Sequence, residues 1–91
     1  MKEITQDKLE KYLKITATAL AKAKEAFDGE HAEEIWDMAN RYYKDAKHFK
    51  EKGDYVNAFA AINYAHGWLD CGARLGHFDV HDSTLFTVDD E

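Results

Sequence analysis

Hydrophobic side chains recur along most of this chain at alternating spacings of three and four residues, the period of one helical face. One such stripe consists of Leu9, Leu13, Thr16, Leu20, Ala23 and Phe27. A second stripe consists of Ala32, Ile35, Ala39, Tyr42, Ala46 and Phe49. Sustained alternation of period two is not found before residue 77, so the pattern predicts helices rather than strands.

Glycines and capping residues divide the pattern into three helices. Gly29, Gly53 and Gly76 follow the apolar stretches, and glycine readily adopts the left-handed conformation that ends a helix. Thr5 and Asp54 are the expected N-caps of the first and third helices. The helices that these signals predict span residues 5–27, 31–52 and 54–75.

Short connections make consecutive helices antiparallel neighbours, so the fold class predicted is all-α, an up-down-up three-helix bundle. The bundle is expected to occupy residues 1–76, and a short acidic C-terminal tail, residues 77–91, is expected to be ordered at most in part. A chain of 91 residues and 10.5 kDa has room for one such core. The absence of proline agrees with a helical fold.

Composition and charge exclude several classes of protein. The longest apolar run, 58–62, is far shorter than the ~20 residues of a membrane span, and one cysteine cannot form an internal disulfide. Residues 1–6 carry no apolar signal core, so we expect a cytoplasmic protein without a membrane partner. The net charge of -6 argues against nucleic acid as the main partner. However, residues 77–91 carry five acids and no Lys or Arg, so the net charge of residues 1–76 is only -1.

The third helix has two apolar faces, although a three-helix bundle covers only one face of each helix. The face expected to point inward holds Tyr55, Ala58, Phe59, Ile62, Ala65, Leu69 and Ala73. The opposite face holds Ala61, Tyr64, Trp68, Cys71 and Leu75. Gly67 and Gly72 lie in the same helix and indicate close backbone packing.

Two different segments could cover the second apolar face of the third helix: the tail of the same chain or a protein partner. The tail would cover it through Leu85, Phe86 and Val88, or a protein partner would cover it, as a homo-oligomer (dimer) or a complex with another protein. A third alternative leaves the aromatic residues partly exposed with their polar tips in water. We predict that the interface residues are Tyr64, Trp68, Cys71 and Leu75.

A narrow polar wedge separates the two apolar faces of the third helix. It consists of Asn63, His66, Asp70 and Arg74. The spacing of four residues allows Asp70 to contact both His66 and Arg74. The wedge is either a structural network or the floor of a site for a small molecule or nucleotide, and it contains no evident nucleophile, so no catalytic residue is assigned.

Signals for metals, cofactors and nucleases are weak. His77, Asp79, His81 and Asp82 crowd the start of the tail, but their spacing is not that of a zinc site, so no metal is predicted. The glycine-rich phosphate-binding patterns are missing, and no cofactor is predicted. Arg41 and His48 are arranged as in the motif of HEPN-type ribonucleases, which is a third hypothesis. The acidic residues Glu34, Asp37 and Asp45 lie near Arg41 and His48 in the sequence and would repel the phosphates of RNA.

One stretch of the chain resembles a known family. The string Ala65-His66-Gly67-Trp68-Leu69-Asp70, followed by Gly72-Ala73-Arg74-Leu75-Gly76, is similar to the family called domain of unknown function 357, and the similarity covers roughly residues 5–80. The resemblance implies an archaeal, cytoplasmic, all-helical bundle and implies no activity. Members usually carry a small residue where this chain has Cys71, which implies an inert role for the thiol.

Overall fold

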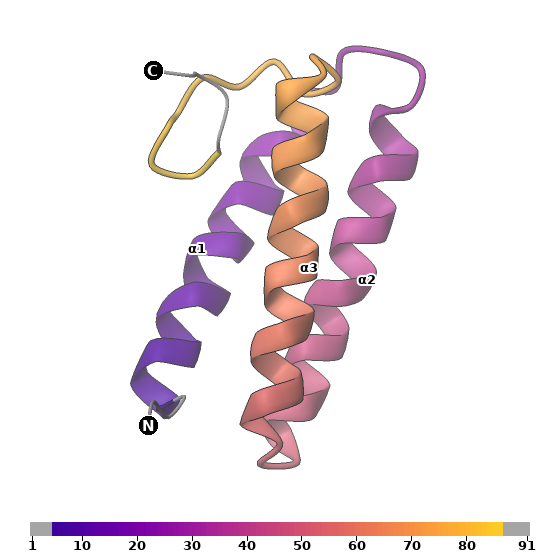
Figure 1. Ribbon diagram of the computed structural model, residues 1–91. Helices are drawn as coiled ribbons and strands as arrows, with labels where there is room; N and C mark the ends of the chain where they lie inside the picture. The colour runs from indigo at the N-terminus through magenta and orange to yellow at the C-terminus, as the bar shows by residue number, and fades with distance from the viewer. Residues whose placement is uncertain (1–4, 87–91) are drawn as a thin grey trace.

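Three helices lie side by side in the computed structural model, which describes residues 5–86 (Figure 1). They are α1 (Gln6–Lys24), α2 (Ala32–Glu51) and α3 (Tyr55–Arg74). The connection between α1 and α2 lies at one end of the bundle and the connection between α2 and α3 at the other, so neighbouring helices run antiparallel. The prediction of an all-α, up-down-up bundle is confirmed.

The helix ends follow the local signals closely, except at the end of α1. Thr5 caps α1 by accepting a hydrogen bond from the Lys8 amide, and Asp54 caps α3 by accepting one from the Asn57 amide, as predicted. Helix α1 ends at Lys24, three residues before the predicted end. Phe27 instead forms an isolated antiparallel bridge with Phe78.

This bridge joins the chain after α1 to the chain after α3. The Asp28 amide donates to the His77 carbonyl, and the Asp79 amide donates to the Ala26 carbonyl, both at 2.8 Å. The two hydrogen bonds require extended backbone beside Phe27, so α1 cannot continue through it. Gly29, with φ of 134°, then turns the chain toward α2.

The core consists of two buried clusters stacked along the bundle. The cluster farther from the α2–α3 connection contains Ala19, Leu20, Ala23, Ala32, Ala39, Leu69, Ala73, Phe78 and Phe86. The other contains Leu9, Leu13, Ala46, Ala58, Ala61, Ile62 and Ala65. The predicted inner face of α3 therefore lies in the core, with Tyr55 and Phe59 at its margin. Small residues let α2 and α3 pack most extensively of the three pairs.

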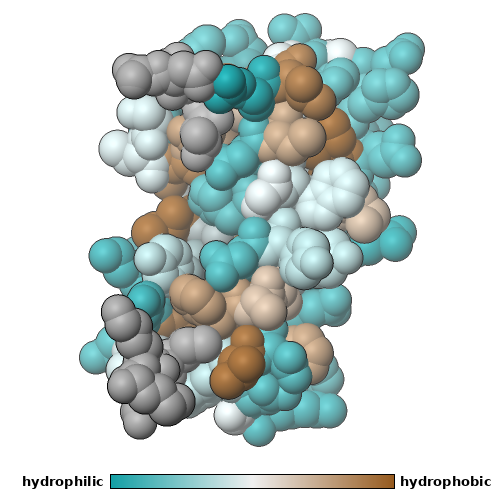
Figure 2. Space-filling model, viewed as in Figure 1, coloured by the Kyte–Doolittle hydropathy of each residue, from teal (hydrophilic) through white to brown (hydrophobic). Residues whose placement is uncertain are grey.

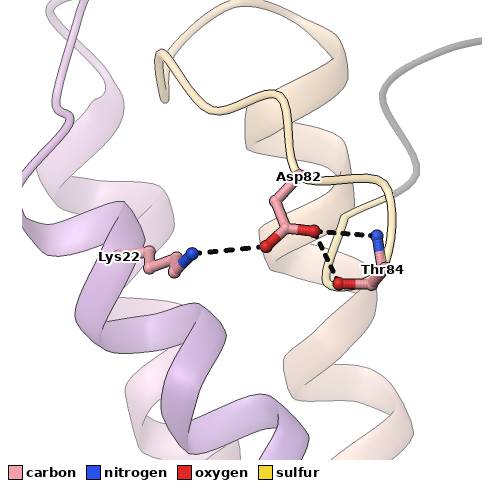
Figure 3. A network of polar contacts seen from close by, with 3 residues as sticks. All are labelled: Lys22, Asp82 and Thr84. Carbon is pink, nitrogen blue, oxygen red and sulfur yellow. Dashed lines mark hydrogen bonds and ion pairs between the residues drawn. The ribbon is translucent and has the colours of Figure 1, made fainter.

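Part of the tail is folded onto the bundle. Phe78 and Phe86 belong to the first core cluster, with only 1% and 2% of their surface exposed. Asp82 forms an ion pair with Lys22 of α1 at 3.2 Å and accepts hydrogen bonds from Thr84 (Figure 3). The hydrogen bonds from Thr84 and the ammonium of Lys22 hold the pKa of the Asp82 carboxyl below its usual range.

Candidate functional site

The outward-facing side of α3 is an exposed apolar surface. We call it the outer face of α3 and define it by Ala60, Tyr64, Gly67, Trp68, Cys71 and Leu75. Tyr64 and Leu75 are 64% and 66% exposed, Cys71 is exposed, and Trp68 is half-buried. In Figure 2, pale and brown side chains run along the front of the molecule, where α3 lies, and teal side chains border them.

A shallow groove runs along this face. Its volume is about 560 Å³, and it is lined by Ala60, Asn63, Tyr64, Gly67, Trp68 and Cys71. Three of the four predicted interface residues, Tyr64, Trp68 and Cys71, therefore share one hollow. The fourth, Leu75, directly follows α3 and is exposed at the end of the helix.

The two aromatic side chains of the groove are held by their neighbours. The Tyr64 ring stacks on the ring of Tyr42 from α2, with centroids 5.2 Å apart and an interplanar angle of 19°. Trp68 packs against the first core cluster while part of its ring stays accessible. Both anchors are thus oriented before any partner arrives, which reduces the entropy lost on binding.

The described part of the tail does not cover the outer face. None of residues 77–86 lines the groove. Leu85 and Phe86 pack instead on the first core cluster, and the tail runs along the α1 side of α3 (Figure 1). Val88, the other residue predicted to cover this face, lies outside the described residues.

His66 of the polar wedge ties together α1, α3 and the tail. Its Nε2 atom lies 2.6 Å from the Leu85 carbonyl oxygen, and its Nδ1 atom lies 3.1 Å from the hydroxyl of Thr16. A carbonyl oxygen can only accept, so Nε2 carries the proton and donates a hydrogen bond to the Leu85 carbonyl. In the neutral ring, Nδ1 then accepts a hydrogen bond from the Thr16 hydroxyl. Asp70 Oδ1 lies 3.8 Å from Nε2, which confirms the predicted proximity of these two residues.

The wedge borders a second, more polar hollow. Its volume is about 350 Å³, and it is lined by Tyr12, Ile15, Thr16, Ile62, Asn63, His66, Gly67, Asp70 and Thr84. Asn63 and Gly67 line both hollows, so the wedge and the groove are adjacent. Arg74 is exposed and does not line the second hollow, so the structure brings together three of the four wedge residues there.

The residues considered for other chemistry lie elsewhere. Arg41 lines a hollow with Met38 and the acids Glu30, Glu33, Glu34 and Asp37, and His48 is not among its lining residues. This places the predicted ribonuclease arginine in an acidic setting. In the part of the chain that the structure describes, no group of three His, Cys, Asp or Glu side chains is arranged to hold a metal ion.

Sequence reasoning missed two contributors to the groove and its surroundings, Tyr42 and Ala60. Tyr42 was assigned to the core stripe of α2, and its stacking on Tyr64 depends on the crossing of two helices. Ala60 precedes Tyr64 by four residues, so its helical position could have revealed it. Gly67 was also predicted to pack closely, yet a Cβ atom there would meet no described atom within 4 Å outside the local helix. Gly72 does pack closely, because its Cβ would collide with the ring of Phe78.

Comparison with known proteins identifies the family. The family model described as "Protein of unknown function (DUF357)" matches residues 11–78, so the chain belongs to this family, as its resemblance predicted. The match includes all of α2 and α3 and most of α1. No curated protein and no solved structure matches the chain. Among the described helices, none is both long and apolar enough to cross a membrane.

Proposed function

We propose that this member of the DUF357 family is a protein–protein interaction module that binds through the outer face of α3. The observation that carries the proposal is the groove, which holds one exposed and one half-buried aromatic ring on a surface of small and apolar residues. Tyrosine and tryptophan are enriched among the residues that dominate binding energy at protein interfaces. The interface residues are Tyr64, Trp68, Cys71 and Leu75.

The architecture supports a binding role over a purely structural role for these side chains. Tyr64 and Leu75 are about two-thirds exposed and therefore contribute little to the folded core. Exposed apolar side chains that form one contiguous surface mark an interaction site more often than single scattered ones do. Asn63 of the polar wedge lines the groove and gives it a polar edge, which would help to fix the orientation of a partner.

Photo-crosslinking in living cells tests the proposal directly. Benzoylphenylalanine is placed at position 64, in the groove, and in a matched control at position 44, an exposed site on α2. We expect covalent adducts with protein from position 64 and none from position 44. Adducts of twice the chain mass and adducts with another protein both support the function and differ only in the partner. An absence of adducts at position 64 contradicts it.

A small-molecule site is the second candidate, and the hollow beside His66 is the observation that favours it. This hollow is more enclosed than the groove and brings an imidazole, a carboxylate and two threonine hydroxyls together. Its described lining includes no Lys or Arg, so a hydroxyl-bearing or cationic molecule fits it better than a nucleotide phosphate. A thermal-shift screen tests this candidate, because a ligand that binds only the native state raises the Tm. No shift with sugars, amines, nucleotides or metals contradicts it.

A further inference from the structure

Large and small side chains alternate along the outer face of α3. The large residues are Tyr64 and Leu75, which are exposed, and Trp68, which is half-buried; the small residues Ala60, Gly67 and Cys71 alternate with them along the helix. Gly67 is the most informative of the small residues. Glycine destabilises a helix interior relative to alanine, and no atom of the described chain beyond the local helix fills the space that a Cβ would take. The close packing that would explain Gly67 is therefore not found among residues 5–86 of one chain.

We propose that the outer face of α3 docks against the same face of a second copy of this chain, with the two α3 helices antiparallel; this inference rests on the function proposed above. A twofold axis that crosses the helix pair between positions 67 and 68 places each large residue opposite a small one. Trp68 lies opposite Gly67 of the second copy, Tyr64 opposite Cys71, and Leu75 opposite Ala60. The axis repeats each contact, as a twofold dimer requires.

The same residues do not fit a parallel pair. A parallel twofold arrangement sets every residue opposite its own copy, so the two Trp68 rings collide while the two Gly67 positions leave a void. Interfaces need the packing density of protein interiors, which neither a collision nor a void provides. Only the antiparallel register matches all three large residues with small ones.

Charge does not oppose this pairing. Between Tyr55 and Arg74, α3 carries one acid, Asp70, and one base, Arg74, so two α3 helices meet without net charge. Most of the net charge of -6 belongs to residues 77–91, and the described part of that segment lies on the α1 side of α3. Repulsion between distant surface charges is also screened over about 8 Å at physiological salt.

The size of the contact predicts a weak dimer. Twenty helical residues span about 30 Å, and one helix presents a strip roughly 10 Å wide. Such a strip is smaller than the ~800 Å² per partner of a standard interface, so it belongs with transient contacts. Dimer formation should therefore be measured at protein concentrations up to about 1 mM, because a dimer with a millimolar Kd is substantially populated there.

Disulfide formation in the purified protein tests the register. Cys71 is the one cysteine of the sequence, and the antiparallel register sets it opposite Tyr64 of the second copy. In the Tyr64→Cys variant, the two thiols of one chain stand about 10 Å apart along the helix, too far to bond to each other. We expect mild oxidation to give a covalent dimer from Tyr64→Cys but not from the matched control Lys44→Cys. Equal yields from the two variants overturn the proposal, and rapid cross-linking of the wild type overturns the antiparallel register.

Sedimentation of the Gly67→Gln variant provides a second test. A Cβ atom at position 67 has no neighbour within 4 Å among the described residues, so we expect the variant to keep its fold, while the longer Gln side chain occupies the space assigned to Trp68 of the second copy. We expect the Kd of the dimer to rise at least about tenfold, with no change for Lys44→Gln. If the wild type stays monomeric at about 1 mM, the proposal that a second copy binds this face is overturned. The function proposed above is judged separately, since adducts of position 64 with a different protein in cells would still support it.

Discussion

Replacing Phe86 by alanine tests whether the tail is part of the folded core. Phe86 is only 2% exposed and packs in the first core cluster, although it lies twelve residues beyond the end of α3. Truncating a buried phenylalanine costs roughly 3–5 kcal/mol when a cavity remains. Here the tail can lift away instead of leaving a cavity, so we expect the low end, about 3 kcal/mol. That is a large share of the ~5–15 kcal/mol by which small domains are stable.

Urea unfolding followed by far-UV circular dichroism measures this cost. We expect the free energy of unfolding to fall by about 3 kcal/mol, and the Tm to fall by roughly 12 °C or more. Ser83→Ala, an exposed substitution in the same segment, is the control and is expected to stay within about 0.5 kcal/mol of the wild type. A loss below about 1 kcal/mol for Phe86→Ala would refute the packing of the tail on the bundle.

Three further predictions follow from the contacts. Gly72→Ala is expected to destabilise the fold by about 1–3 kcal/mol in urea unfolding, because its Cβ would lie 2.8 Å from Phe78 Cδ2 and 3.1 Å from Ile35 Cγ2; an unchanged midpoint would contradict this. Thr16→Val is expected to cost about 1–2 kcal/mol by the same assay, since His66 loses the hydroxyl that bonds its Nδ1 atom, whereas Thr18→Val, whose hydroxyl is exposed, serves as the control. The lowered pKa of Asp82 means that its charged form stabilises the fold above the usual carboxyl range and that this contribution disappears as the pH falls through the folded-state pKa. Asp82→Asn should therefore lower the Tm at neutral pH and leave it unchanged well below pH ~4, and a Tm difference that persists in acid would disprove the assignment.

The sequence predicted the helices well because their signals are local. Thr5 and Asp54 cap the helices through hydrogen bonds within one turn, and the glycines act through their own φ angles. The end of α1 was mispredicted because the competing hydrogen bonds of Ala26 and Asp28 come from residues about fifty positions later. The hydrophobic pattern along the sequence does not indicate which distant segments pair with each other.

The candidate site was predictable only in part for the same reason. The second apolar face of α3 follows from helical periodicity, and the structure leaves Tyr64, Cys71 and Leu75 of that face exposed. Ala61 was placed on the same face, but it is buried because α2 packs closely against α3. The route of the tail past His66, rather than over Trp68, depends on the fit of Phe86 into a cluster built by all three helices. Composition and spacing do not encode that fit.

A dilution series followed by methyl NMR tests the central claim, that the outer face of α3 is a surface at which two copies meet. The Leu75 methyl groups lie at the end of this face, and those of Ile15 line the hollow on the α1 side. As the concentration rises toward about 1 mM, we expect the Leu75 resonances to shift along a binding curve while those of Ile15 stay fixed. Leu75 resonances that do not move over the whole series, or shifts confined to Ile15, would contradict the account.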